Sequence, residues 1–466
     1  VITNPPYMGN ASVKLGEYLK INYLESKYDL YGAFIVRGLN ALKRNGFEAM
    51  ITGDSWLSIK SFNEMRKKLI NQYTFQQLLH LGNGAFDCGF GTVSFVIRNS
   101  YLNYNVVCQD LRSSIEKKDE FHKEANKKYI VNFKTFNKIP YMPIAYWINK
   151  KLIKIFNTKS MRSQINTKAG IVTGNNKKFM KLWYEVNYND INFKALNHTD
   201  MYDTKWVPTH KGSGYRKWFG NIEYIVSLRD LWDDTKVNKS VRRGDKEFYF
   251  KEGITWSTLS NVFGARKSDT GFVCDTKGSM AFPKDIKKLY NIIGVLNSDY
   301  ASQILKILSP NLDFNKGYIE KIPFIEIEDP EFEKIVKRNI DISRLDWNRN
   351  ETSWGFRTTP LLEFKNNGCI EDAYNLYKKE NNFAFNAMME NEKNINKIVS
   401  DIYDISQEYE ENFNLSHTLI LDEQKYFYNN VTTKKFIKTK QDVIKEFLSF
   451  FVGCCMGRYS LDEEGL

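Results

Sequence analysis

The chain has 466 residues, of which 42% are apolar and 26% are charged, a composition that excludes a disordered tail. This length exceeds what one hydrophobic core usually serves, so we predict two or three domains. The net charge of +12 is uneven: Lys and Arg outnumber Asp and Glu by 20 to 12 in residues 1–150 and by 29 to 18 in residues 151–326, but trail by 18 to 23 in residues 331–466. The first two-thirds can therefore neutralise a polyanion, unless the excess is an ordinary solvated surface.

Nothing in the sequence points to export, membrane insertion or metal binding. No signal peptide opens the chain, and the longest apolar run near its end, Phe447–Cys455, is far shorter than the roughly 20 residues that span a bilayer. Neither cysteines nor histidines are spaced as metal ligands, so we predict a reduced, cytoplasmic protein without metal. The cysteines occupy positions 88, 108, 274, 369, 454 and 455, and the histidines are His80, His122, His198, His210 and His417.

Residues 1–100 alternate strand-like and helix-like segments. The opening Val1–Thr3 has the character of the end of a buried strand, and the apolar spacing that follows predicts further elements of both kinds. In chain order these are a helix over Leu30–Lys43, a strand over Phe47–Thr52, a helix over Phe62–Gln72, and strands over Phe75–Leu81 and Thr92–Arg98. Such alternation is typical of an open α/β sheet.

The character of the chain changes from about Tyr141. Short apolar runs between Gly, Trp and Tyr predict an α+β region rich in loops, whose one long helical period is Ile286–Leu308. A mainly helical end begins at Pro330, with predicted helices over Ile335–Ile342, Glu371–Lys379, Asn391–Tyr403 and Asp442–Cys454. We therefore predict three domains, over residues 1–140, 141–328 and 329–466.

Asn4-Pro5-Pro6-Tyr7 directly follows the first predicted strand, at the sheet edge where ligands bind in α/β proteins. These residues suit methylation of an exocyclic amine, because its nitrogen lone pair is delocalised into the base ring and is a poor nucleophile. The Asn4 side-chain oxygen and the Pro5 carbonyl can accept the amine hydrogens and draw the nitrogen towards a tetrahedral geometry. Two prolines fix the carbonyl directions, and Tyr7 offers a flat face to an extruded base. The alternative is that Asn-Pro-Pro is only a turn.

The first segment resembles the second half of the amino-methyltransferase fold, in which this motif is followed by a helix and by a strand that ends near a tryptophan. Asp29–Arg44 and Ile51–Trp56 match that order. The resemblance implies S-adenosylmethionine as cofactor, held by a glycine-bearing loop that precedes the motif, so that Asn4 is the one cofactor-binding residue expected here. Gly82-Asn83-Gly84 imitates the loop, but its place after a late strand argues against this role.

Longer stretches resemble the adenine methyltransferases of BREX phage-defence systems. The resemblance is carried by Ala169–Asn176, Lys211-Gly212, Tyr215–Asn221, Gly253–Ser257, Leu296–Ser298, Ser309–Phe314, Lys321–Phe324, Arg344–Trp347, Glu351–Trp354, Gly453 and Gly457–Asp462. It implies a partial Rossmann-like methyltransferase sheet, then an α+β target-recognition domain, then a mainly helical C-terminal domain. It also implies methylation of adenine in host double-stranded DNA at a short site, which distinguishes the host from phage.

The same resemblance implies other BREX proteins as partners, namely a PglZ phosphatase-like protein and a large ATPase. Val1 is not an initiator methionine and the cofactor loop would precede it, so we expect the C-terminal part of a longer enzyme, inactive alone. Alternatives are a DNA-specificity or scaffold module, part of a single-chain restriction-modification enzyme, or an enzyme that methylates RNA bases or protein glutamine. The excess charge of residues 151–326 favours DNA.

Candidate DNA-contacting cations lie in loop-like, Gly-rich stretches of the recognition region, where phosphate contact or bidentate guanine recognition is feasible. They are Lys177, Lys178, Arg216, Lys217, Arg242 and Arg243. The alternative for each is a solvated surface cation. Four tryptophans of the same region are predicted to be core residues: Trp183, Trp206, Trp218 and Trp256.

Overall fold

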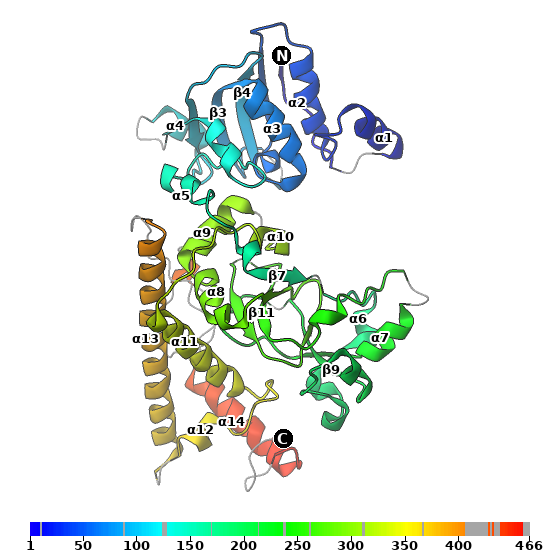
Figure 1. Cartoon of the computed structure of the whole chain (residues 1–466). Coiled ribbons are helices and arrows are strands. Elements are labelled where there is room, and N and C mark those ends of the chain that lie inside the picture. Colours follow the sequence, from blue (N-terminus) through cyan, green and yellow to red (C-terminus); the bar gives the residue numbers. More distant parts are fainter. Residues whose placement is uncertain are drawn as a thin grey trace. The chain divides into compact units, whose positions relative to one another are not determined.

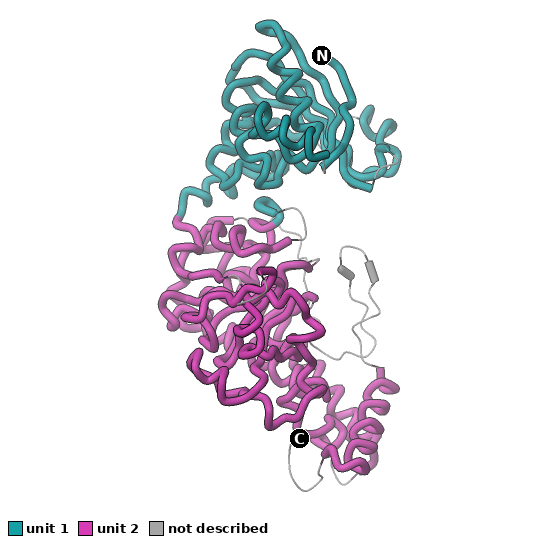
Figure 2. Tube along the Cα trace, turned by 90° about the vertical axis from the view of Figure 1, so that its right-hand side faces the viewer, with its two compact units in different colours: residues 1–158, 306–310 teal, residues 159–305, 311–466 magenta. Residues whose placement is uncertain are grey.

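A computed structural model describes the whole chain except residues 10–11, 87–88, 124–127, 169, 213, 236–238, 261, 310–312, 366–367, 406–426, 429–430, 433–438 and 460–466. Cys88, His417, Ala169 and parts of Ser309–Phe314 and Gly457–Asp462 therefore lie outside the described residues. The chain divides into two compact units, residues 1–158 with 306–310 and residues 159–305 with 311–466, drawn in different colours in Figure 2. The boundaries predicted after residues 140 and 328 stay predictions.

The first unit is built on a six-stranded sheet of order β1-β2-β4-β3-β5-β6 (Figure 1). The strands are β1 (Ile2–Thr3), β2 (Phe47–Gly53), β3 (Thr74–Gly82), β4 (Thr92–Arg98), β5 (Val106–Asp110) and β6 (Lys128–Val131). β1 runs parallel to β2, and β3 runs parallel to β5, while β4 pairs antiparallel with both β2 and β3. The carboxyl ends of β1, β2, β3 and β5 consequently lie at one edge of the sheet.

The helices of this unit are α1 (Val13–Asn22), α2 (Leu30–Asn40), α3 (Asn63–Gln72), α4 (Lys117–His122) and α5 (Lys150–Ile155). The strands and helices predicted in residues 1–100 are confirmed to within a few residues, whereas α1 was not predicted. α2 packs on β2 through Gly38, where an added Cβ would lie 2.0 Å from Glu48 Oε2 and 2.9 Å from Met50 Cε. Only glycine allows the helix to approach the strand this closely.

Arg66 on α3 is fully buried and ties the turn after β2 to a distant segment of the same unit. Its guanidinium donates to the carbonyl oxygens of Trp56, Ser58, Ile59, Tyr141 and Met142, at 2.6 to 3.3 Å. A planar group with five N–H donors suits this arrangement, because its three nitrogens together reach five carbonyls on two segments of the chain. The turn that begins at Asp54 is thereby fixed at its far end.

The second unit contains two four-stranded sheets, of order β13-β9-β10-β8 and β12-β11-β14-β7. Their strands are β7 (Ile165–Lys168), β8 (Met180–Leu182), β9 (Val207–His210), β10 (Tyr224–Val226), β11 (Gly253–Trp256), β12 (Ala265–Ser268), β13 (Val273–Cys274) and β14 (Met280–Pro283). Short helices α6 (Asn176–Phe179) and α7 (Leu228–Asp234) lie between these strands, and α10 (Lys316–Ile319) follows them in the chain. Trp183, Trp206, Trp218 and Trp256 are buried, which confirms the prediction made for these four tryptophans.

The single helix predicted over Ile286–Leu308 is wrong, because the structure has α8 (Leu289–Leu296) and α9 (Asp299–Leu308). The break falls at Asn297 and Ser298. The Asn297 side chain accepts from the backbone N–H of Ala265 at 2.8 Å and donates to its carbonyl at 3.0 Å. This contact with β12 is long-range, so the apolar spacing of the segment gave no sign of it.

The end of the chain is helical, with α11 (Pro330–Asn348), α12 (Pro360–Glu363), α13 (Ile370–Ile402) and α14 (Lys440–Cys455), and the short strands β15 (Phe427–Tyr428) and β16 (Val431–Thr432) lie between α13 and α14. The two helices predicted over Glu371–Lys379 and Asn391–Tyr403 are one helix of 33 residues. Asn381 and Asn391 in its middle are buried, where Asn381 accepts from Arg349 and Asn391 donates to Asn339. In the described part of the chain, no helix has the length and apolar character to span a membrane.

Glu48 on β2 gives the first unit an unusual buried acid. Both carboxylate oxygens are buried without a hydrogen-bond partner among the described residues, and this burial raises the pKa from 4.5 to about 8. The folded protein therefore keeps the proton over a pH range in which the unfolded chain loses it. Stability linked to this group is present below about pH 4.5 and is lost as the pH rises through about 8.

We predict that the free energy of unfolding falls between about pH 5 and about pH 8, and that Glu48→Gln weakens this fall and raises stability at the upper end. The measurement is urea unfolding across that pH range. Glu17→Gln, on the exposed side of α1, is the control and should keep the fall of the parent protein. A Glu48→Gln profile that parallels the parent profile would contradict the assignment.

Candidate active site

Asn4-Pro5-Pro6-Tyr7 lies where β1 ends, next to the carboxyl end of β2. The register pairs Thr3 with Met50, so the motif leaves the sheet beside the last residues of β2. Asn4 is exposed, Pro5 is buried and Tyr7 is half-buried. The motif thus presents a polar side chain to solvent from an anchored backbone, at the edge that the sequence predicted.

The Asn4 carboxamide is oriented by Tyr7. The Tyr7 hydroxyl donates to Asn4 Oδ1 at 2.7 Å, and the carbonyl of Ile51 on β2 lies 3.4 Å from the same hydroxyl. An amide oxygen has two lone pairs, so Asn4 Oδ1 can accept a second hydrogen while it holds the first. The arrangement therefore offers a fixed, exposed acceptor.

Two aromatic rings flank Tyr7. The ring of Phe90 lies 5.0 Å from the Tyr7 ring in an edge-on arrangement, and that of Tyr31 lies 6.2 Å away. Tyr31 is buried, its hydroxyl pairs with Ser55 Oγ at 2.5 Å, and burial raises the pKa of its phenol. Phe90 is 40% exposed, which leaves an aromatic side chain open beside the motif. Phe90 was not predicted, and its one signal was a lone aromatic between Gly89 and Gly91.

The chain after Tyr7 is tied to the start of α2. The backbone N–H of Met8 donates to Asp29 Oδ1 at 3.0 Å, and the Met8 carbonyl accepts from Leu30 N at 3.2 Å. Asp29 is also the N-cap residue of α2, where its side chain accepts from Tyr31 N. One carboxylate thus fixes both the exit of the motif and the helix that carries Tyr31.

The segment that carries Phe90 is anchored through Asp54, the residue after β2. Asp54 N donates to the Gly91 carbonyl at 3.0 Å, and Asp54 Oδ2 lies 3.1 Å from His80 Nε2. His80 is buried on β3, and its Nδ1 lies 3.0 Å from the Tyr146 hydroxyl. A Cβ added at Gly91 would lie 2.0 Å from Asp54 Oδ2. The connection therefore requires glycine at position 91.

Gly82-Asn83-Gly84 does not lie beside the motif in the sheet, because β2 and β4 separate β3 from β1. An added Cβ at Gly82 would lie 2.9 Å from Arg112 Cγ, so that face of the turn is already filled. Among the described residues, no cluster of three or more His, Cys, Asp or Glu side chains could hold a metal ion. The site therefore consists of amide, carbonyl and aromatic groups.

Arg216 and Lys217 do not lie on the surface, which corrects the expectation that they contact DNA. They are 7% and 3% exposed, and each is paired with an acid on a C-terminal helix. Arg216 Nη2 lies 3.0 Å from Asp346 Oδ2 on α11, and Lys217 Nζ lies 3.1 Å from Glu392 Oε2 on α13. A buried cation that already has a partner cannot reach a phosphate unless the pair opens. The segment joins the recognition region to the helices.

The other four candidates lie at or near the surface, but they differ in how far contacts within the protein already engage them. Lys177 and Arg242 are exposed, and Lys178 is exposed but pairs with Asp234 at 2.8 Å. Arg243 is half-buried, stacks over the Trp232 ring at 4.3 Å and donates to the Trp232 carbonyl. Lys177, Lys178 and Arg242 are thus accessible to a ligand, whereas Arg243 mainly holds α7.

Comparisons with known proteins place this site in context. Residues 1–86 match the family model of the Eco57I restriction-modification methylase. Over its whole length the chain is 33% identical to the adenine-specific methyltransferase PglX of Lacticaseibacillus casei (strain Zhang) and 34% identical to the adenine-specific methyltransferase BrxX of Escherichia coli O9:H4 (strain HS). The matched regions make up 40% and 39% of those proteins, so the chain spans about two-fifths of their length.

The fold also resembles that of the Type IIL restriction-modification enzyme MmeI, solved in complex with DNA. The TM-score is 0.51, with 11% sequence identity, and the match covers 88% of this chain and 55% of MmeI. At this identity the likeness shows the fold alone.

We predict that Gly91→Ala lowers the melting temperature and separates Phe90 from Tyr7, because the new methyl group overlaps Asp54. Thermal unfolding and the nuclear Overhauser contact between the two rings measure these effects. Gly89→Ala is the matched control, since a Cβ there meets nothing within 4 Å. Equal behaviour of the two variants would refute the anchoring role of Asp54.

Proposed function

Because the chain is homologous along its whole length to the adenine-specific methyltransferases PglX and BrxX, we propose that it is part of a site-specific DNA adenine methyltransferase. The reaction transfers a methyl group to the exocyclic amine of adenine. One observation carries the proposal: Asn4 presents an oriented, exposed oxygen at the end of β1, with aromatic rings beside it. The match of residues 1–86 to a methylase family supports it.

Asn4 and Pro5 would act on the amine nitrogen. Asn4 Oδ1 and the Pro5 carbonyl accept its two hydrogens, which weakens conjugation of the lone pair with the ring and makes the nitrogen more nucleophilic. Tyr7 holds the carboxamide in place, so little reorganisation is needed when the base arrives. No strong base is required, because the proton leaves to water after the new bond has formed.

Tyr7 and Phe90 would hold the base itself. An adenine must leave the duplex before its amine can reach Asn4, and the cost of a few kcal/mol is offset by stacking on aromatic side chains. Phe90 is 40% exposed beside Tyr7, so the two rings supply an apolar surface next to the acceptor. We assign Phe90 to the base-binding site together with the motif.

S-adenosylmethionine would supply an electrophilic methyl group. The chain's residues fit only the reacting end of this cofactor: Asn4 is exposed beside the reaction position, whereas the Gly82–Gly84 turn is filled by Arg112. We therefore propose that the methionine end is held by residues that this chain does not provide. Alone, the chain would be inactive.

The basic recognition region would bind double-stranded DNA, with Lys177, Lys178 and Arg242 as contacts and Arg243 as a lesser one. The domain assignment proposed with it is the partial Rossmann-like sheet, the recognition domain and the helical C-terminal domain. By homology to PglX and BrxX, the protein would act in BREX phage defence in the cytoplasm, with PglZ and a BREX ATPase as partners.

A second candidate function is a DNA-specificity or scaffold module without catalysis. It is favoured by the edge of the sheet, because β1 pairs only with β2 among the described residues and Ile2 is 89% exposed. An apolar edge strand of this kind invites another polypeptide.

In the complete protein, Asn4→Ala should reduce adenine methylation by about 10²- to 10³-fold, as expected when a preorganised polar group is lost. Asn4→Asp keeps an acceptor oxygen at this position and should retain more activity than Asn4→Ala. Single-molecule sequencing reads the methylated sites, and gel retardation checks that DNA binding is unchanged. Full methylation by Asn4→Ala would remove Asn4 from the reaction.

Calorimetry tests whether the methionine end of the cofactor is held outside this chain. We predict that these 466 residues bind S-adenosylmethionine weakly, with a dissociation constant above about 1 mM, because they offer only the reacting end of the site. Micromolar binding would contradict the proposal that the methionine end is held elsewhere.

A further inference from the structure

A polar hollow lies at the end of the ladder between β7 and β14 in the second unit. Its volume is about 310 Å³, and it is lined by Arg162, Ile165, Asn166, Thr167, Lys168, Lys284 and Glu320. β7 is the last strand of its sheet, and Pro283 of β14 pairs with Ile165. Arg162, Asn166 and Lys284 are exposed, so the hollow is open to solvent.

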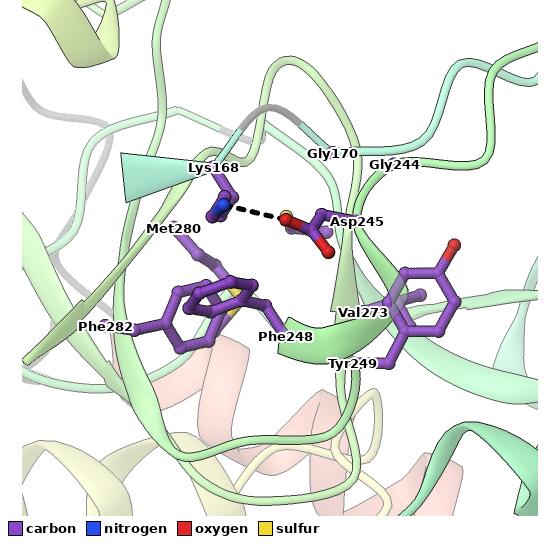
Figure 3. A pocket seen from close by; sticks show the side chains of 10 residues that line it. Lys168, Gly170, Gly244, Asp245, Phe248, Tyr249, Val273, Met280 and Phe282 are labelled. Atoms are coloured by element: carbon purple, nitrogen blue, oxygen red, sulfur yellow. Dashed lines mark hydrogen bonds and ion pairs between the residues drawn. The ribbon is translucent and has the colours of Figure 1, made fainter. Parts of the chain in front are cut away.

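The hollow is lined by three cations, Arg162, Lys168 and Lys284, and by one carboxylate, Glu320. Not all of these cations are free to bind a ligand. Lys168 Nζ pairs with Asp245 at 2.7 Å and lies over the Phe248 ring, so its charge is directed to a neighbouring pocket (Figure 3). That pocket holds only about 10 Å³, which is room for one water molecule. Glu320 Oε1 accepts from the Thr167 hydroxyl. Arg162 and Lys284 are the remaining cations.

The backbone fixes both of these residues in place. Arg162 N donates to the Glu320 carbonyl at 3.0 Å, and Lys284 N donates to the Gln164 carbonyl at 2.8 Å. Lys284 Nζ donates to the Arg162 carbonyl at 3.0 Å, which brings the two side chains to one rim. Among the residues that the structure describes, neither cation forms an ion pair with a carboxylate. Two positive charges therefore share a polar cavity without a counter-charge of their own.

We propose that this hollow binds phosphate groups of the DNA backbone, through Arg162 and Lys284 with Asn166 beside them. The inference rests on the proposed function and adds a binding site to it. Phosphate oxygens fit because the exposed lining side chains, Arg162, Lys284 and Asn166, are two cations and an amide, whereas the one carboxylate, Glu320, accepts from Thr167. Phosphate contacts supply most of the non-specific affinity of DNA-binding proteins. The excess of 29 Lys and Arg over 18 Asp and Glu in residues 151–326 steers a polyanion to this region.

The test is the salt dependence of DNA binding by the full chain. Fluorescence anisotropy with a non-specific duplex gives the slope of log K against log salt concentration, to which each phosphate contact contributes about 0.9. Arg162→Gln with Lys284→Gln should reduce the slope by about 2, and each single substitution by about 1. Arg162→Lys with Lys284→Arg keeps both charges and should keep the slope.

Lys379→Gln with Lys397→Gln is the matched control. Both lysines are exposed on α13, and the double substitution removes the same charge as Arg162→Gln with Lys284→Gln. It should leave the slope unchanged. A parent chain that does not bind DNA at low salt would contradict the proposed function. Binding by the parent with an unaltered slope in the Arg162/Lys284 variant would overturn this inference alone. Competition by millimolar inorganic phosphate with no slope change would mark the hollow as a free-anion site and overturn its assignment to DNA.

Discussion

The hydrogen bond from the Tyr7 hydroxyl to Asn4 Oδ1 is the interaction on which the candidate active site depends. It fixes the direction of a carboxamide that is otherwise exposed and free to rotate. Because β1 runs parallel to β2 and ends opposite Met50, the Tyr7 hydroxyl lies 3.4 Å from the Ile51 carbonyl, beside the last residues of β2. Asp29 then fixes the exit of the chain, and Asp54 fixes the segment that carries Phe90. The acceptor is therefore set before any base arrives.

Positive charge serves two different purposes in this protein. Arg216 and Lys217 lie inside the second unit, where they pair with Asp346 and Glu392 and join the recognition region to the C-terminal helices. The pairs are buried, so removal of one partner would leave an uncompensated charge that costs about 3–5 kcal/mol. Exposed cations at the rim of the β7–β14 hollow have no such role in the fold. The net charge of a region consequently overstates how much of it is available to DNA.

Local patterns predicted the elements of the first unit well, because β2, β4 and α3 are specified by apolar spacing within each segment. Long-range contacts account for what was missed. The hydrogen bonds between Asn297 and β12 interrupt the helix predicted there. In α13, the buried Asn381 and Asn391 have hydrogen-bond partners, which allows one helix to continue across a polar stretch. The Asn4–Tyr7 motif was predictable because its residues are adjacent in sequence. Phe90 was not, since it reaches Tyr7 only through the chain of contacts from His80 to Asp54 to Gly91.

The most direct test of the account is a structure of the complete protein bound to a duplex that carries its methylation site. The quantity to measure is the distance from the amino nitrogen of the target adenine to Asn4 Oδ1. We expect an extruded adenine against the surface formed by Tyr7 and Phe90, with its amino nitrogen about 3 Å from Asn4 Oδ1 and from the Pro5 carbonyl. An adenine that is bound elsewhere, with its amine out of hydrogen-bond reach of Asn4, would contradict the account.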